Sequence, residues 1–327
     1  ALIDYLDITQ KGKLPLLRAP QRENEARTVQ IDAATRRNLE LTHGMGGGRA
    51  GSLLALMDRT ATAGGARLLE RRISSPSRML ETITKRLDAV TFGAENSRLT
   101  EELRGALRKI PDLDRALSRL SLDRGGPRDL TAIRNGLIEA EGIARTLSPL
   151  QLPSLLSESI IGLSGHSDLI DLLDEALVAE PPLLVRDGGF IAPDYRDDLD
   201  EARKLRDEGR SVIAQMQQEF VSITGISALK IKHNNVLGYF IETTATHAEK
   251  MLSAPLSEKF IHRQTTANQV RFTTVELSEM ETKILNAGNR ALEIEKRLYD
   301  DLKASVLDNA AQIGAASSGL AEIDLAL

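Results

Sequence analysis

The chain has 327 residues, and its 42 Lys and Arg against 47 Asp and Glu give a formal net charge of −5. This acidic balance argues against binding to a nucleic-acid backbone, and the absence of cysteine excludes disulfides, thiolate metal sites and cysteine nucleophiles. The apolar runs are too short to span a bilayer, no signal peptide is visible, and the first residue is Ala rather than Met, so we expect part of a larger protein.

The N-terminal region predicts one short helix followed by a glycine-rich loop. Residues 28–31 are a candidate extended piece, and Asp32 is the expected N-cap of a helix that reaches Leu41. The loop from Gly44 to Ser52 lacks the preceding strand and the Gly-Lys-Ser/Thr ending of a phosphate-binding loop. We therefore interpret it as a surface loop in which Ser52 caps the next helix, 53–59.

Residues 52–177 carry apolar side chains at helical spacing. One such stripe comprises Met79, Ile83, Leu87 and Val90. Pro and Gly turn signals divide the region into about six helices, which predicts an irregular helical bundle. Carboxylate pairs such as Asp112 and Asp114 have no metal-ligand pattern beside them and are expected to face solvent. The segment 181–191 interrupts the helices, and its Asp187-Gly188 pair predicts a tight turn.

After Pro193 the pattern changes to a long helix, a β module and a second long helix. The first helix should end at Gly225, because glycine is a natural C′ residue. Residues 226–274 carry β-type residues around polar turns, which predicts about four strands with exposed hairpin tips. Apolar residues from Leu277 to Val306 then follow one face of the returning helix.

Several of these segments resemble one family. Ala228 to Glu242 (Ala-Leu-Lys-Ile-Lys-His-Asn-Asn-Val-Leu-Gly-Tyr-Phe-Ile-Glu) looks like the clamp sequence of the MutS family of DNA mismatch-repair proteins, and Asp32 to Leu41 is similar to its core signature. Further segments follow in the family's order: Thr60 to Leu69, Asp112 to Leu120, Pro127 to Leu130, Pro181 to Asp194 and Leu320 to Asp324. The resemblance covers essentially the whole chain. It departs at Ile73, where Trp is usual, at His233, where Tyr or Phe is usual, and in a divergent connection at 245–259.

The resemblance implies a mostly α fold with a small inserted β module. We expect a helical core (1–194), an outgoing lever helix (195–225), a β clamp (226–274), and a returning lever helix with the end of the core (275–327). The two long helices should pack antiparallel, with a four-stranded antiparallel clamp at their tip. Such a stalk suits a tip that grips a ligand, and it equally suits a passive spacer.

The same resemblance implies that the family's mismatch-reading, connector and ATPase domains are absent from this chain. Phe240-Ile241-Glu242 matches the mismatch-reading Phe-x-Glu pattern, but it lies in the clamp motif, where Phe and Glu share one strand face. We therefore expect no enzyme activity, no catalytic residue and no metal or cofactor in this chain. ATP and Mg belong to the ATPase domain of the parent family.

The implied role is a clamp that holds the backbone of double-stranded DNA without reading sequence, with levers that couple it to the ATPase. Long cations and small polar donors at the hairpin tips suit phosphate, and the few aromatic residues (3%) offer little for stacking on bases. The predicted DNA-binding residues are Lys230, Lys232, Asn234, Asn235, Arg263, Gln264, Thr265, Thr266, Asn268 and Arg271. Asn234 and Asn235 can also serve the turn itself.

The implied partners are double-stranded DNA, a second copy of the protein and a MutL-type repair partner. The implied location is the bacterial cytoplasm, at the nucleoid and not in a membrane. Two alternatives remain: a helical scaffold whose β tip binds protein, and a free-standing hydrolase, which no phosphate-binding loop supports. Residues 227–274 hold six Lys or Arg and three Glu, a local charge of +3. The net acidity therefore does not exclude DNA at the β module.

Overall fold

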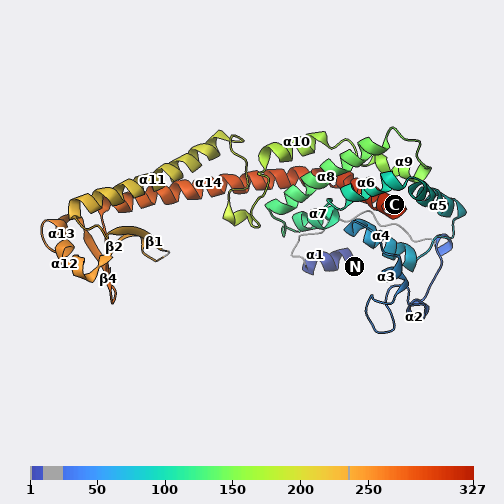
Figure 1. Cartoon of the computed structure of the whole chain (residues 1–327), viewed down its shortest axis with the longest axis horizontal. Coiled ribbons are helices and arrows are strands. Elements are labelled where there is room, and N and C mark those ends of the chain that lie inside the picture. Colours follow the sequence, from blue (N-terminus) through green and yellow to red (C-terminus); the bar gives the residue numbers. More distant parts are fainter. Residues whose placement is uncertain (1, 10–24, 235) are drawn as a thin grey trace. The chain divides into compact units, whose positions relative to one another are not determined.

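The computed structural model (Figure 1) describes residues 2–9, 25–234 and 236–327. The chain forms two compact units, the first from residues 1–192 and 299–327 and the second from residues 193–298. The predicted class, mostly α with one small β module, is confirmed.

The first unit is a helical bundle. Its elements are α1 (Leu2–Thr9), η1 (Glu25–Arg27), α2 (Ala33–Asn38), α3 (Leu53–Met57), α4 (Ala63–Ser74), α5 (Leu80–Glu95), α6 (Ser97–Leu107), α7 (Leu113–Ser121), α8 (Pro127–Leu147), α9 (Ser154–Ile161), α10 (Ser167–Ala176), η2 (Val185–Asp187), the end of α14 (Val275–Asp308) and α15 (Ala310–Ala326). Apolar α15 lies among α4, α5, α7, α8 and α9. It therefore supplies much of the bundle's interior.

The predicted helix caps are present. The Asp32 side chain accepts a hydrogen bond from the Thr35 N–H at the start of α2, and the Ser52 hydroxyl accepts from the Ala55 N–H at the start of α3. Both caps use backbone donors that a helix start leaves without partners. Thr28 pairs with Ser77 in an isolated antiparallel bridge, as the expected extended piece allows.

The helix count in the bundle was wrong. Residues 52–177, all of which are described, form eight helices rather than about six. One unpredicted break lies at Asn96, between α5 and α6, where the backbone leaves helical geometry without a Pro or Gly to mark it. The apolar stripe that begins at Met79 is also not buried, since its Leu87 remains 60% exposed. Asp187-Gly188 forms the predicted turn, at the end of the 3₁₀ helix η2. The strand-like pairing beside this turn is an isolated bridge between Leu177 and Ile191.

The second unit contains the long helix pair and the sheet. Its elements are α11 (Asp197–Thr224), β1 (Lys230–Asn234), β2 (Gly238–Thr244), α12 (Ala245–Leu252), α13 (Leu256–Lys259), β3 (Ile261–Thr265), β4 (Gln269–Thr273) and residues 275–298 of α14. The two long helices run antiparallel, as Figure 1 shows. Arg203 of α11 donates to Glu295 of α14 at 2.7 Å, and farther along Gly209 packs against Ile284.

Helix α11 ends where the sequence predicts. Gly225 has φ of +65°, a left-handed conformation that favours glycine and closes the helix C-terminus. The four strands pair antiparallel in the order β1-β2-β4-β3. The divergent connection at 245–259 forms α12 and α13, which the sequence analysis did not predict.

Candidate nucleic-acid interface

The sheet has one face buried against helices of its own unit. Ile241 and Phe272 on this face join an apolar cluster with Phe220 of α11 and Leu277 of α14. Phe220 also meets Phe260 edge-on, with ring centroids 5.3 Å apart. This packing fixes the sheet to the ends of the helix pair and leaves the opposite face for other contacts.

A polar row crosses the opposite face. The strand register pairs Lys230 of β1 with Glu242 of β2, Glu242 with Arg271 of β4, and Arg271 with Gln264 of β3. Directly paired residues in a sheet project to the same side. Four residues that are far apart in the sequence therefore form one line across all four strands.

Hydrogen bonds join three members of this row and Lys232, the next residue of β1 on the same face, into a network. Lys232 Nζ donates to Glu242 Oε1 at 2.6 Å, and Arg271 Nε donates to Glu242 Oε2 at 3.2 Å. Arg271 Nη1 also donates to Gln264 Oε1 at 2.8 Å. We call Lys232, Glu242, Arg271 and Gln264 the Glu242 network.

The carboxylate of the network lies beneath its cations. The Glu242 side chain is 5% exposed, whereas the side chains of Lys232 and Arg271 are 49% and 22% exposed. Burial acts to raise the pKa of Glu242, but hydrogen bonds and charges from Lys232 and Arg271 outweigh it and hold that pKa below its ordinary value. The Arg271 guanidinium also lies 4.6 Å from the centre of the buried Phe240 ring.

The turn between β1 and β2 uses one of the predicted contact residues for itself. Asn234 Oδ1 accepts hydrogen bonds from the N–H groups of Val236 (2.9 Å) and Leu237 (2.8 Å). This asparagine therefore shapes the turn, as its residue type allows. Gly238 ends the turn with φ of +69°. Asn235 lies outside the described residues.

The turn between β3 and β4 carries the other predicted residues. The N–H and the hydroxyl of Thr266 both donate to the Gln269 carbonyl, and Thr265 Oγ1 lies 2.9 Å from His262 Nε2. The β3 pairing shifts between His262 and Gln264, so Arg263 occupies a bulge. Within the described chain, the exposed side chains of Lys230, Arg263 and Asn268 have no hydrogen-bond or ion-pair partner.

The predicted site residues thus fall into three groups. Lys232, Gln264 and Arg271 belong to the Glu242 network; Asn234, Thr265 and Thr266 make local hydrogen bonds; and Lys230, Arg263 and Asn268 present open donors. Glu242, which links two of the cations, was not among the residues predicted from the sequence. Its signal was the strand alternation that places Glu242 and Phe240 on one face.

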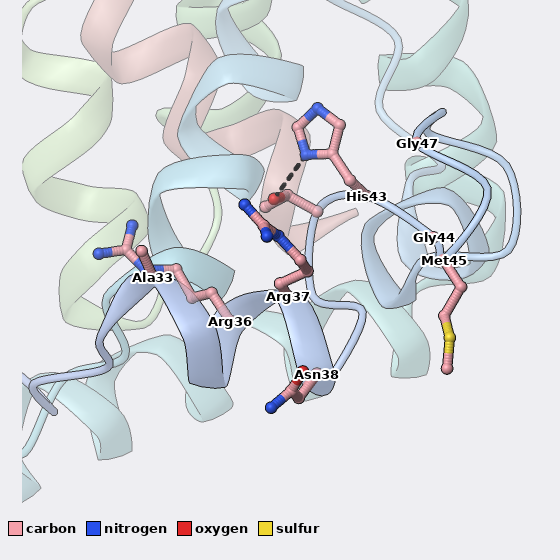
Figure 2. A pocket seen from close by; sticks show the side chains of 9 residues that line it. Ala33, Arg36, Arg37, Asn38, His43, Gly44, Met45 and Gly47 are labelled. Carbon is pink, nitrogen blue, oxygen red and sulfur yellow. Dashed lines mark hydrogen bonds between the residues drawn. The ribbon is translucent and has the colours of Figure 1, made fainter.

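A second surface feature, in the first unit, is a pocket of about 730 Å³ between α2 and the glycine-rich loop. Figure 2 shows Arg36 and Arg37 leaving α2 in different directions, with His43 and Met45 on the loop. The Arg36 Nε donates to the Ile31 carbonyl at 3.1 Å. In this view (Figure 2) the guanidinium groups of Arg36 and Arg37 lie apart.

No group of three or more His, Asp or Glu side chains among the described residues is placed to hold a metal ion. No helix among those residues is long and apolar enough to cross a membrane.

Comparison with known proteins gives a consistent result. The sequence model of a family described as MutS domain III matches residues 34–327. The chain is 71% identical over 324 residues to the DNA mismatch repair protein MutS of Roseobacter denitrificans. The aligned residues make up 99% of this chain and 37% of that protein. It is 68% identical over 326 residues to the Ruegeria pomeroyi protein of the same name, and the aligned residues make up 100% of this chain and 37% of that protein. The Paracoccus denitrificans protein of the same name is 63% identical over 325 residues, which make up 99% of this chain and 37% of that protein. The chain spans 37% of the length of these relatives.

Proposed function

The chain belongs to the MutS family of DNA mismatch-repair proteins, and from that premise we propose that its second unit grips the backbone of double-stranded DNA during mismatch repair. The observation that carries this proposal is the polar face of the sheet. It presents Lys230, with open donors, in line with Glu242, and the bulge of β3 beside Gln264 carries the exposed Arg263. Lys and Arg in such positions make charge-assisted contacts to phosphate.

The ligand class follows from the chemistry of that face. The one aromatic side chain of the polar face, Phe240, is 3% exposed and lies under Arg271, so it offers no surface for stacking on a base. A face of cations and small polar donors suits the phosphates of a duplex, which carry no sequence information. We therefore expect matched and mismatched duplexes to bind this chain with equal affinity.

The remaining roles extend the proposal to the longer protein. The paired helices α11 and α14 would couple the clamp to an ATPase domain, ATP and Mg would act in that domain, and this chain alone would hydrolyse no ATP. A second copy of the protein and a MutL-type partner would complete the repair assembly. Its place of action would be the bacterial cytoplasm, at the nucleoid.

Salt-dependent binding tests the proposal directly. We expect fluorescence anisotropy with a labelled 30-base-pair duplex to show binding that weakens steeply as salt is added. In a plot of the logarithm of the binding constant against the logarithm of the salt concentration, each phosphate neutralised contributes about −0.9 to the slope. Lys230→Gln with Arg263→Gln should reduce that slope by about 1.8. Neither side chain has an internal partner in the described chain, so the helical circular dichroism should not change.

Arg98→Gln with Arg108→Gln provides the matched control, because it also removes two positive charges. Arg98 and Arg108 are exposed residues in α6 and at its C-terminal end, in the first unit. This double variant does not touch the sheet. It should leave the salt slope unchanged. A wild-type chain that binds no duplex at low salt would refute the proposal. Salt-insensitive capture of a protein by the sheet face would favour a protein-binding scaffold instead.

A further inference from the structure

The two cations at the centre of the polar face carry their own counter-ion. Lys232 and Arg271 each donate to a different oxygen of the one Glu242 carboxylate. Resting on the proposed function, we propose that Glu242 is a positioning residue that limits the strength of the DNA grip. It holds the two cations in line and cancels one of their two charges.

The hydrogen-bond geometry leaves room for phosphate on top of the network. A lysine ammonium has three donors and an arginine guanidinium has five. Lys232 uses one donor on Glu242, and Arg271 uses one on Glu242 and one on Gln264. Both cations therefore keep donors for a ligand while they remain bound to Glu242.

Burial keeps the carboxylate behind the cations. With 5% of its side chain exposed, Glu242 is shielded from direct contact with a phosphate. Its charge nevertheless acts at short range. A phosphate oxygen bound to Lys232 Nζ would lie within about 5 Å of the Glu242 carboxylate, since the Nζ–Oε1 distance is 2.6 Å and a charge-assisted hydrogen bond adds about 2.8 Å.

Repulsion between that phosphate and Glu242 opposes binding. Two like unit charges at about 5 Å in water change a binding constant by about 4-fold. Removing the carboxylate charge should therefore tighten DNA binding by about that factor. A residue that served the fold alone would not have this effect.

Glu242→Gln is the direct test, because glutamine keeps the shape of the side chain and removes its charge. We expect anisotropy with the same 30-base-pair duplex to show about 4-fold tighter binding at low salt and a salt slope steeper by up to about 0.9. Glu242→Asp keeps the negative charge and should therefore not show the tighter binding. Circular dichroism and thermal melting establish that each variant is folded.

A second neutralisation separates position from net charge. Glu249 is exposed on α12 of the same unit and has no partner in the described chain. Glu249→Gln adds the same charge away from the network and should change DNA affinity by less than about 1.5-fold under the same salt.

Three outcomes would overturn the inference: unchanged affinity in folded Glu242→Gln, weaker affinity in that variant, or an equal gain in Glu249→Gln. In each of these outcomes the wild-type chain would still bind duplex DNA. The double substitution Lys230→Gln with Arg263→Gln would still weaken that binding. The proposed function would then stand without a limiting role for Glu242. Loss of duplex binding by the wild type would refute both.

Discussion

Replacing Asp324 with Ala removes a buried contact that joins the two ends of the first unit's sequence. Asp324 lies on α15 and is 2% exposed. Its carboxylate accepts hydrogen bonds from the N–H groups of Ala61 and Thr62, each at 2.8 Å, and from the Thr62 hydroxyl at 2.6 Å. The Thr62 hydroxyl in turn accepts from the Gly65 N–H at the start of α4.

The expected cost follows from the number of donors that lose their acceptor. Two N–H groups and one hydroxyl would lose their acceptor at a helix start where Thr62 is buried and Ala61 is half-buried, and each lost hydrogen bond costs about 1 kcal/mol. Asp324→Ala should therefore lower the free energy of unfolding by about 3 kcal/mol. Asp324→Asn, which retains one acceptor oxygen, should lose less.

Urea unfolding followed by circular dichroism measures the loss, and hydrogen exchange assigns it to the first unit. Exchange should accelerate in peptides that cover α4 and α15 and stay unchanged in α11. Asp308→Ala is the control, because Asp308 is exposed and has no partner in the described chain. A loss below about 1 kcal/mol, or one equal to that of the control, would show that the three hydrogen bonds do not stabilise the bundle.

Three further substitutions test other parts of the fold. Phe272→Ala should lower the free energy of unfolding by about 3–5 kcal/mol, because the ring is fully buried in the second unit. Hydrogen exchange should become faster in β2 and β4 but not in α8. Gly225→Ala should cost about 1 kcal/mol, seen as a lower Tm, because φ of +65° disfavours a residue with a Cβ; an unchanged Tm would contradict the left-handed cap. Burial raises the pKa of Tyr299 to about 12, above its ordinary value near 10, so the native state keeps a proton that the unfolded state loses. Stability should therefore fall by up to about 2 kcal/mol as the pH rises from 10 to 12, and urea unfolding of Tyr299→Phe should lack that decline.

Features that depend on neighbouring residues could be predicted from the sequence. The caps at Asp32 and Ser52 and the helix end at Gly225 each follow from one residue's preference and the pattern beside it. The break at Asn96 could not be predicted in this way. Neither Pro nor Gly marks it, and the Asn96 side chain does not cap α6 but donates to the Phe92 carbonyl at the end of α5.

The candidate site was predictable in composition but not in arrangement. The cations of the β module are visible in the sequence, but their order across the sheet is not. Strand β4 lies beside β2, and this long-range pairing brings Arg271 to Glu242. A one-residue change of register would move either side chain to the other face. The Glu242 network therefore became apparent only from the sheet topology.

The discontinuous sequence of the first unit has a consequence for synthesis on the ribosome. Helix α15 packs among α4, α9 and their neighbours, yet it is made only after the 106 residues of the second unit, 193–298. At 5–20 residues per second that interval lasts about 5–20 s. During this time the nascent bundle exposes the apolar surfaces that α15 will cover, while the second unit is still being synthesised. Nascent chains of this protein should therefore be substrates for ribosome-associated chaperones until α15 emerges.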